Sequence, residues 1–198
     1  MNKYTELRKI YNDAGVNIYG FRITLDMSMP DAAYDYAFKA AKLCGADQIT
    51  MELPDNPALT KRIGEFGSKY KTMVGYHAHL QRRADIWDLA MSQSPYNGIN
   101  FDVGHYVAAG NHDSIEFIKK NHSRITSMHL KDRRFPENGG KSMPWGEGDT
   151  PLKEILQLAK QEGYKFPHTI ELEYPVPPGS TSVIEVGKCV QFCKAALA

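Results

Sequence analysis

Residues that can bind a metal ion or move a proton recur where apolar segments of this chain end. In the stretch GINFDVGHYVAAG, an apolar run leads to Asp102, and Gly104 and His105 follow at once. The whole set of such residues is Glu52, His77, His79, Asp102, His105, His129, Lys131, Glu171 and Glu173. Side chains of these types can bind a divalent cation and transfer protons if the fold brings them together.

The elements that must position these residues alternate between two kinds. Six segments are predicted to be strands: 16–25, 46–53, 71–79, 98–104, 124–132 and 167–174. Seven segments are predicted to be helices: 4–15, 30–45, 57–70, 83–93, 113–122, 151–163 and 181–198. A long loop is expected over 133–149. This alternation indicates parallel βαβ units, whose active sites lie at the carboxyl ends of the strands.

Two architectures are compatible with parallel βαβ units. A doubly wound nucleotide-binding sheet would usually carry a glycine-rich turn after its first strand. Here that strand is followed by DMSMPDAA, which contains no glycine. A (β/α)8 barrel takes about 250 residues, and six βα units in 198 residues fit a barrel without its first two units. The sequence therefore predicts an α/β fold, a TIM barrel lacking its first two βα units, with residues 1–198 forming one incomplete domain.

Alternation along the strands places the polar groups on shared faces. The pairs on one face are His77 with His79, His129 with Lys131, and Glu171 with Glu173. The residues between them, Leu130, Ile170 and Leu172, point the other way, toward the covering helices. We therefore expect the polar groups to converge in one pocket.

A divalent cation would stabilise carboxylates gathered in such a pocket, because a buried carboxylate without a partner is very costly. Three carboxylates and one imidazole form a hard, oxygen-rich set that suits Mn²⁺, Mg²⁺, Co²⁺ or Zn²⁺. The sequence predicts one such ion. Its expected ligands are Glu52, Asp102, His129 and Glu171.

Composition excludes several classes of partner. The formal net charge is +1 and there is no run of Lys or Arg, so neither nucleic acid nor a membrane surface is expected as a partner. No apolar run approaches the ~20 residues of a membrane span. The three cysteines lie in predicted helices and suggest no disulfide framework. The expected location is the cytoplasm, although a lost N-terminal signal would allow the periplasm, and a homo-oligomer stays open.

Several motifs together resemble a known superfamily. They are ITMELP, GYHAH, FDVGHYVAAG, MHLKDRR, PWGEGDTPLKEIL and TIELEYP. They resemble the xylose-isomerase-like TIM barrels, the group of sugar phosphate isomerases and epimerases, from about Val16 to the C-terminus. The resemblance implies the same four metal ligands. It also implies that His77, His79 and Lys131 lie near the substrate.

Each assignment has a structural alternative. Glu52 could cap the next helix, Asp102 could form a turn, and His129 could be a buried hydrogen-bonded histidine. His77 and His79 could orient other residues, and His105 could serve packing or a supporting hydrogen bond. Lys131 could pair with Asp132 or a neighbouring acid, and Trp145 could anchor a loop. Of the two neighbouring glutamates, Glu171 is preferred over Glu173 as the ligand because it lies deeper.

The resulting hypothesis is a metal-dependent isomerase or epimerase of a small sugar or sugar derivative, acting through an enediolate. Glu52, Glu171 and Lys131 are the expected catalytic residues. The expected substrate-binding residues are His77, His79, His105, Trp145 and Glu173. The alternatives are a lyase or hydrolase acting on a keto-sugar glycoside, and a non-catalytic degenerate barrel. A nuclease of the endonuclease IV type is disfavoured by the neutral charge and the few histidines.

Overall fold

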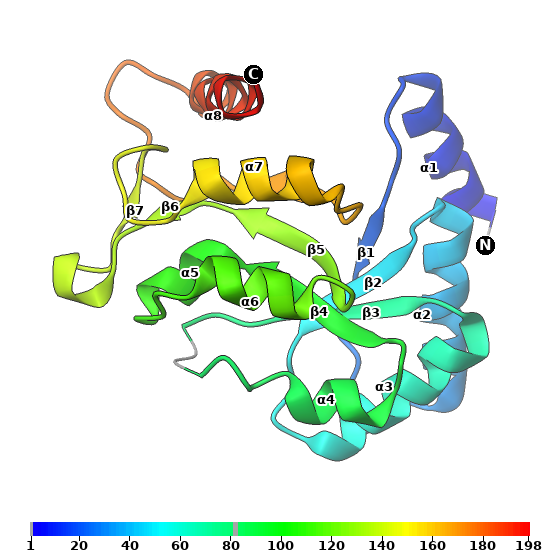
Figure 1. Cartoon of the computed structure of the whole chain (residues 1–198). Helices are drawn as coiled ribbons and strands as arrows, with labels where there is room; N and C mark the ends of the chain where they lie inside the picture. Colours follow the sequence, from blue (N-terminus) through cyan, green and yellow to red (C-terminus); the bar gives the residue numbers. More distant parts are fainter. Residues whose placement is uncertain (1, 81–82) are drawn as a thin grey trace. The chain divides into compact units, whose positions relative to one another are not determined.

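The computed structural model describes residues 2–80 and 83–198, which fold into two compact units. Of these residues, the first unit comprises 2–77 together with 85–100, and the second comprises 78–80, 83–84 and 101–198. Figure 1 shows helices alternating with strands along the chain, as the sequence predicts.

The first unit contains four parallel strands. They are β1 (Gly20–Arg22), β2 (Gln48–Glu52), β3 (Met73–His77) and the beginning of β4 (Asn97–Asp102), and each neighbour in this order is paired with the next. The helices are α1 (Asn2–Asp13), α2 (Asp31–Cys44), α3 (Pro57–Tyr70) and α4 (Asp88–Gln93). The pairing places Glu52 of β2 beside His77 of β3, at the carboxyl ends of both strands.

Local signals explain where the helices of this unit begin and end. Asn56 caps α3 by accepting the Ala58 N–H, and Pro57 occupies the first turn, where no N–H is needed. Helix α2 ends at Gly45, whose φ of 81° is left-handed and favours glycine. The buried rings of Tyr34 and Phe66 pack together between α2 and α3.

The second unit holds the end of β4 and the pair β5 (Ile125–Leu130) and β8 (His168–Ile170). These last two strands are parallel, with His129 opposite Thr169 and Leu130 opposite Ile170. The remaining elements are α5 (Val103–Ala108), α6 (Ser114–Asn121), β6 (Asp132–Arg133), η1 (Pro136–Asn138), β7 (Ser142–Met143), α7 (Leu152–Glu162) and α8 (Ser182–Leu197).

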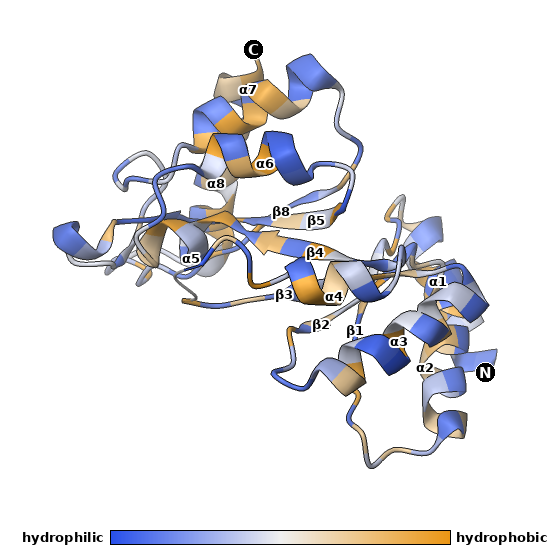
Figure 2. Cartoon of the chain, turned by 60° about the horizontal axis from the view of Figure 1, so that its bottom comes forward, coloured by the Kyte–Doolittle hydropathy of each residue, from blue (hydrophilic) through white to orange (hydrophobic). Residues whose placement is uncertain are grey.

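Helix α7 of the second unit is amphipathic, and Figure 2 shows hydrophobic and hydrophilic residues alternating along it. Its buried residues are Leu152, Ile155, Leu156 and Leu158. Leu130 and Ile170 line an apolar cavity together with Leu156 of α7 and Cys193 of α8. The two strand residues therefore face the helices, as their parity predicts.

The predicted fold class is confirmed: this is an α/β fold with six parallel strands of the TIM-barrel type, each followed by a helix. Some boundaries differ from the prediction. Strand β8 ends at Ile170, helix α4 begins at Asp88, and α5 follows β4 directly where a loop was expected. The expected loop over 133–149 contains the short antiparallel hairpin β6–β7. In the part of the chain that is described, no helix is long and apolar enough to cross a membrane.

Asn97 is a buried polar junction of the first unit. Its amide nitrogen donates to the carbonyl oxygens of Thr60 and Ala90, and its oxygen accepts the Tyr76 hydroxyl. We expect Asn97→Ala to lower the free energy of unfolding by about 2 kcal/mol or more, because two buried carbonyls lose their donor. Urea denaturation measures this loss. Asn12→Ala on the exposed face of α1 is the control and should change stability by less than about 0.5 kcal/mol. Equal losses in both variants would contradict the assigned role.

Candidate active site

Lys131 is the centre of a charged cluster in the second unit. It follows β5 directly, and its side chain is 2% exposed. Its Nζ lies 2.9 Å from Asp102 Oδ2, 2.9 Å from Glu171 Oε2 and 2.9 Å from Glu173 Oε1. Burial alone lowers the pKa of Lys131, but the three carboxylates outweigh it and raise the pKa above its ordinary value. Lys131 is therefore a buried ammonium ion. It pairs with neighbouring acids, as one alternative held, and these are Asp102, Glu171 and Glu173 rather than Asp132.

His129 joins this cluster from the carboxyl end of β5. Its Nδ1 lies 2.6 Å from Glu171 Oε2. A carboxylate can only accept, so His129 Nδ1 carries the proton of this contact. Burial tends to raise the pKa of Glu171, but His129 and Lys131 bring it down to about 2. Glu171 is therefore ionised at neutral pH.

Asp102 has two roles at the end of β4. Its Oδ1 accepts the His105 N–H at 2.8 Å and so caps α5, while its Oδ2 faces Lys131. The next glycine, Gly104, lies inside α5. A Cβ at Gly104 would lie 2.1 Å from Lys131 Cγ and 2.9 Å from the Lys131 carbonyl oxygen. Glycine is required here because Lys131 passes so close to α5.

His105 is oriented by Arg133, a residue that the sequence analysis did not single out. Arg133 Nη1 lies 2.9 Å from His105 Nδ1, and its Nη2 donates to the Gly140 carbonyl. Because a guanidinium can only donate, Nδ1 of His105 must accept and Nε2 must carry the proton. That Nε2 lies 3.9 Å from Glu173 Oε1, and the His79 ring packs edge-on against His105. Burial lowers the pKa of His105 to about 4, so the ring is neutral at pH 7.

A second polar group lies in the first unit. Glu52 Oε1 accepts from Arg22 Nη2 at 2.7 Å, and its Oε2 lies 3.1 Å from His77 Nδ1. His77 is buried, whereas Glu52 is partly exposed. Glu52 and His77 are thus brought together as neighbours in β2 and β3. Arg22, at the end of β1, was not predicted.

The loop that carries Trp145 folds onto Asp132. The buried Asp132 carboxylate accepts the backbone N–H groups of Gly146, Gly148 and Thr150. The Trp145 ring packs edge-on against Phe192 of α8, with 5.7 Å between the ring centroids. This contact favours the loop-anchor role for Trp145 over a sugar-stacking role.

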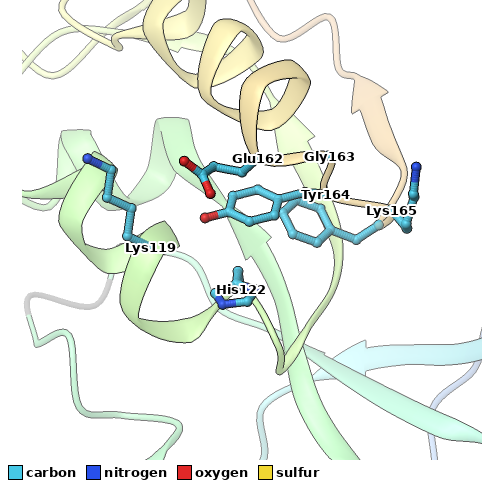
Figure 3. A pocket seen from close by; sticks show the side chains of 7 residues that line it. Lys119, His122, Glu162, Gly163, Tyr164 and Lys165 are labelled. Carbon is cyan, nitrogen blue, oxygen red and sulfur yellow. The ribbon is translucent and has the colours of Figure 1, made fainter.

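The second unit also has a cavity of about 670 Å³ at the amino ends of β5 and β8. Figure 3 shows the Tyr164 ring between Glu162 above and His122 below, with Lys119 to the left. The His122 and Tyr164 rings stack, with their centroids 4.9 Å apart. None of the predicted site residues lines this cavity, which lies at the end of the strands opposite to His129 and Lys131.

The side chains of this cluster are of the types that bind divalent cations. Asp102, Glu171 and Glu173 supply carboxylate oxygens, and His129 supplies an imidazole nitrogen, which suits Mn²⁺, Mg²⁺, Co²⁺ or Zn²⁺. The oxygens already gather around one positive charge, the ammonium of Lys131. Three of the four predicted ligands, Asp102, His129 and Glu171, therefore belong to one cluster. The fourth, Glu52, belongs to the first unit.

Alanine substitutions at Gly104 and Gly187 test how closely Lys131 packs against α5. We expect Gly104→Ala to lower the free energy of unfolding by about 1–3 kcal/mol, because the new methyl group meets the side chain and backbone of Lys131. Gly187→Ala adds a methyl group in α8 with nothing within 4 Å, and should stabilise the protein by roughly 0.5–1 kcal/mol. Thermal unfolding of both variants measures the difference. If neither substitution changes the stability of the protein, the close packing of Lys131 against Gly104 is contradicted.

Arg133→Met should change the tautomer of His105. In the native protein the neutral ring should carry its proton on Nε2, because Arg133 occupies Nδ1. Without the guanidinium we expect a mixture of the two tautomers. Long-range ¹H–¹⁵N correlation spectra at pH 7 distinguish them. Arg134→Met, at the neighbouring arginine, is the control and should leave the His105 signals unchanged. An unchanged Nε2–H ring in Arg133→Met would show that Arg133 does not orient it.

Solved structures are similar to this chain at the level of the fold. One is a xylose isomerase domain protein from Planctomyces limnophilus, with 18% identity and a TM-score of 0.76, covering 98% of this chain and 81% of that chain. Another is a D-allulose 3-epimerase from Methylomonas sp. in complex with D-allulose, with 11% identity and a TM-score of 0.59, covering 83% of this chain and 66% of that chain. A third is a Thermus thermophilus protein whose crystal was soaked with ZnCl2, with 11% identity and a TM-score of 0.59, covering 98% of this chain and 81% of that chain.

The sequence comparisons define the family. No curated protein matches the chain. The family model described as "Xylose isomerase-like TIM barrel" matches residues 60–188, which hold the whole of the second unit's cluster, from Asp102 to Glu173. This match spans well over half of the sequence and agrees with the fold of the solved structures. The chain therefore belongs to the xylose isomerase-like TIM-barrel family.

Proposed function

We propose that this chain is a divalent-metal-dependent isomerase or epimerase of a small sugar or sugar derivative. The observation that carries the proposal is the convergence of Asp102, His129, Lys131 and Glu171 at the carboxyl ends of β4, β5 and β8. Family membership supports the reaction class, and the fold similarity to a D-allulose 3-epimerase is consistent with it.

The metal ion would be held by Asp102, His129 and Glu171, with Glu52 as the predicted fourth ligand. When bound, it would supply Lewis-acid stabilisation of negative charge on substrate oxygens. His129 Nδ1 and Glu171 Oε2 lie 2.6 Å apart, so the two side chains reach the same point of the cluster.

Proton transfer falls to the carboxylates of the chain. Glu171 is ionised at neutral pH and can accept the proton from a carbon that lies between a carbonyl and a hydroxyl group. Lys131 can donate hydrogen bonds to the oxygen on which negative charge develops. Glu52 is the proposed second acid–base group. Return of a proton to the same carbon gives epimerisation. Return of a proton to the former carbonyl carbon, with transfer of the hydroxyl proton from one oxygen to the other, gives isomerisation.

Substrate recognition is assigned to residues around this cluster. His105 offers an Nε2–H donor that is fixed by Arg133, and Glu173 offers a carboxylate beside it. His79 lies against His105, and His77 lies beside Glu52. Trp145 is proposed to anchor the loop through its contact with Phe192 and is not assigned a contact with substrate.

The loop over 133–149 gives little support to the lyase alternative, which needs an acid for the leaving group. Asp149 accepts from the Asn138 amide and the Phe135 N–H, and these hydrogen bonds lower its pKa. It is therefore a poor proton donor at neutral pH. Glu137 lies 3.5 Å from His112, and both side chains are well exposed.

Metal content tests the proposed site. We expect about one divalent ion per purified chain by elemental analysis, and loss of that ion in His129→Ala, because the imidazole ligand is removed. The exposed His112 provides the control, and His112→Ala should keep the ion. Absence of metal in the wild type, even after incubation with Mn²⁺, Co²⁺ or Zn²⁺, would overturn the ligand assignment.

A screen of ketoses in D₂O tests the reaction. Epimerisation or isomerisation by proton transfer should introduce deuterium at the carbon next to the carbonyl, and mass spectrometry detects it. Product without deuterium would favour a hydride shift instead. Release of an alcohol from a keto-glycoside would favour the lyase, and no turnover in the metal-loaded protein would favour a non-catalytic barrel.

A further inference from the structure

Lys131 is built into the second unit as a fixed charge rather than as a mobile surface lysine. Its side chain is 2% exposed, whereas that of Lys188 in the same unit is 63% exposed. Its stem passes Gly104 so closely that no larger residue would fit there. The path of the side chain is therefore determined by packing as well as by charge.

The ammonium ion occupies the oxygens that a metal ion would need. Nζ contacts Asp102 Oδ2 and Glu171 Oε2, which belong to two of the proposed metal ligands, and also Glu173 Oε1. Three carboxylates brought together without a cation would repel one another strongly in a buried site. Lys131 removes part of that repulsion when no metal is bound.

The charges of the cluster match a divalent ion. Counted as ionised groups, the three carboxylates and one ammonium carry a formal charge of about −2. One divalent cation would neutralise this charge. Without the ammonium the cluster would carry one more negative charge, and its attraction for a cation would increase.

We propose that Lys131 is the resident counter-ion of the metal site, which keeps Asp102 and Glu171 in place in the metal-free protein and weakens the binding of the divalent ion. This inference rests on the proposed function, because it requires a metal site at these carboxylates. It assigns Lys131 a thermodynamic role beyond any contact with substrate: metal binds in competition with the protein's own ammonium group.

Calorimetric titration with MnCl2 tests the inference on the full chain. We expect the Kd for Mn²⁺ to fall at least about tenfold in Lys131→Met, because one positive charge leaves the site. The metal-free variant should have a lower Tm than the wild type and a larger Mn²⁺-induced rise in Tm. Lys188→Met is the matched control, since Lys188 pairs with Glu185 away from this cluster, and its Kd should be unchanged.

The outcomes separate the two proposals. If Lys131→Met does not fold, Lys131→Gln, which keeps a hydrogen-bond donor, takes its place and should show the same tightening. Unchanged or weaker Mn²⁺ binding in a folded variant, next to a wild type that binds Mn²⁺, overturns the counter-ion role alone. No Mn²⁺ binding by the wild type or by either variant overturns the metal site and the counter-ion role together. Binding by the variants alone supports the competition directly.

Discussion

A buried charge must find a partner, and the second unit depends on how Lys131 meets this requirement. Its ammonium joins carboxylates from β4 and from the segment after β8. Removing one member of such a group would leave an uncompensated buried charge, which costs several kcal/mol. The ends of three strands therefore act as one electrostatic unit. Neighbouring features follow from it: Gly104 has no side chain because Lys131 needs the space, and Asp102 caps α5 with the oxygen that Lys131 leaves available.

Much of the fold could be predicted because its signals are local. Helix α3 was predicted at its observed bounds, since Asn56, Pro57 and the apolar periodicity that follows them act over one or two turns. Short elements could not be predicted in the same way. Helix α5 has six residues, too few for a periodic pattern. Asp102 caps its start, but the carboxylate was considered only as a metal ligand or a turn former. The strands β6 and β7 have two residues each, and the loop that follows them depends on Asp132, a contact distant in sequence.

The site was predictable in its residue types and less so in its pairings. Strand parity correctly placed His129 and Lys131 on one side of β5 and Leu130 on the other. The same parity continues to Arg133, which the motif MHLKDRR contains but which was given no role because the predicted strand ended at Asp132. Which carboxylate meets Lys131 could not be predicted from spacing, because Asp132 is adjacent in sequence whereas Asp102 is 29 positions away. Only the pairing of the strands and the close approach at Gly104 decide between them.

In the second unit, the residues that balance charge differ from those proposed to recognise the substrate. Lys131, Asp102 and Glu171 fix the charge at the centre, while Arg133 and His105 arrange a neutral donor beside it. Glu173 connects the two, because its Oε1 lies 2.9 Å from Lys131 and 3.9 Å from His105. Its side chain is one-third exposed, so it can meet a substrate while remaining paired. Changes at His105 or in the loop that holds Arg133 would therefore alter the shape of the site without disturbing its central charges. Such a division is one physical reason why a single barrel architecture can serve many substrates.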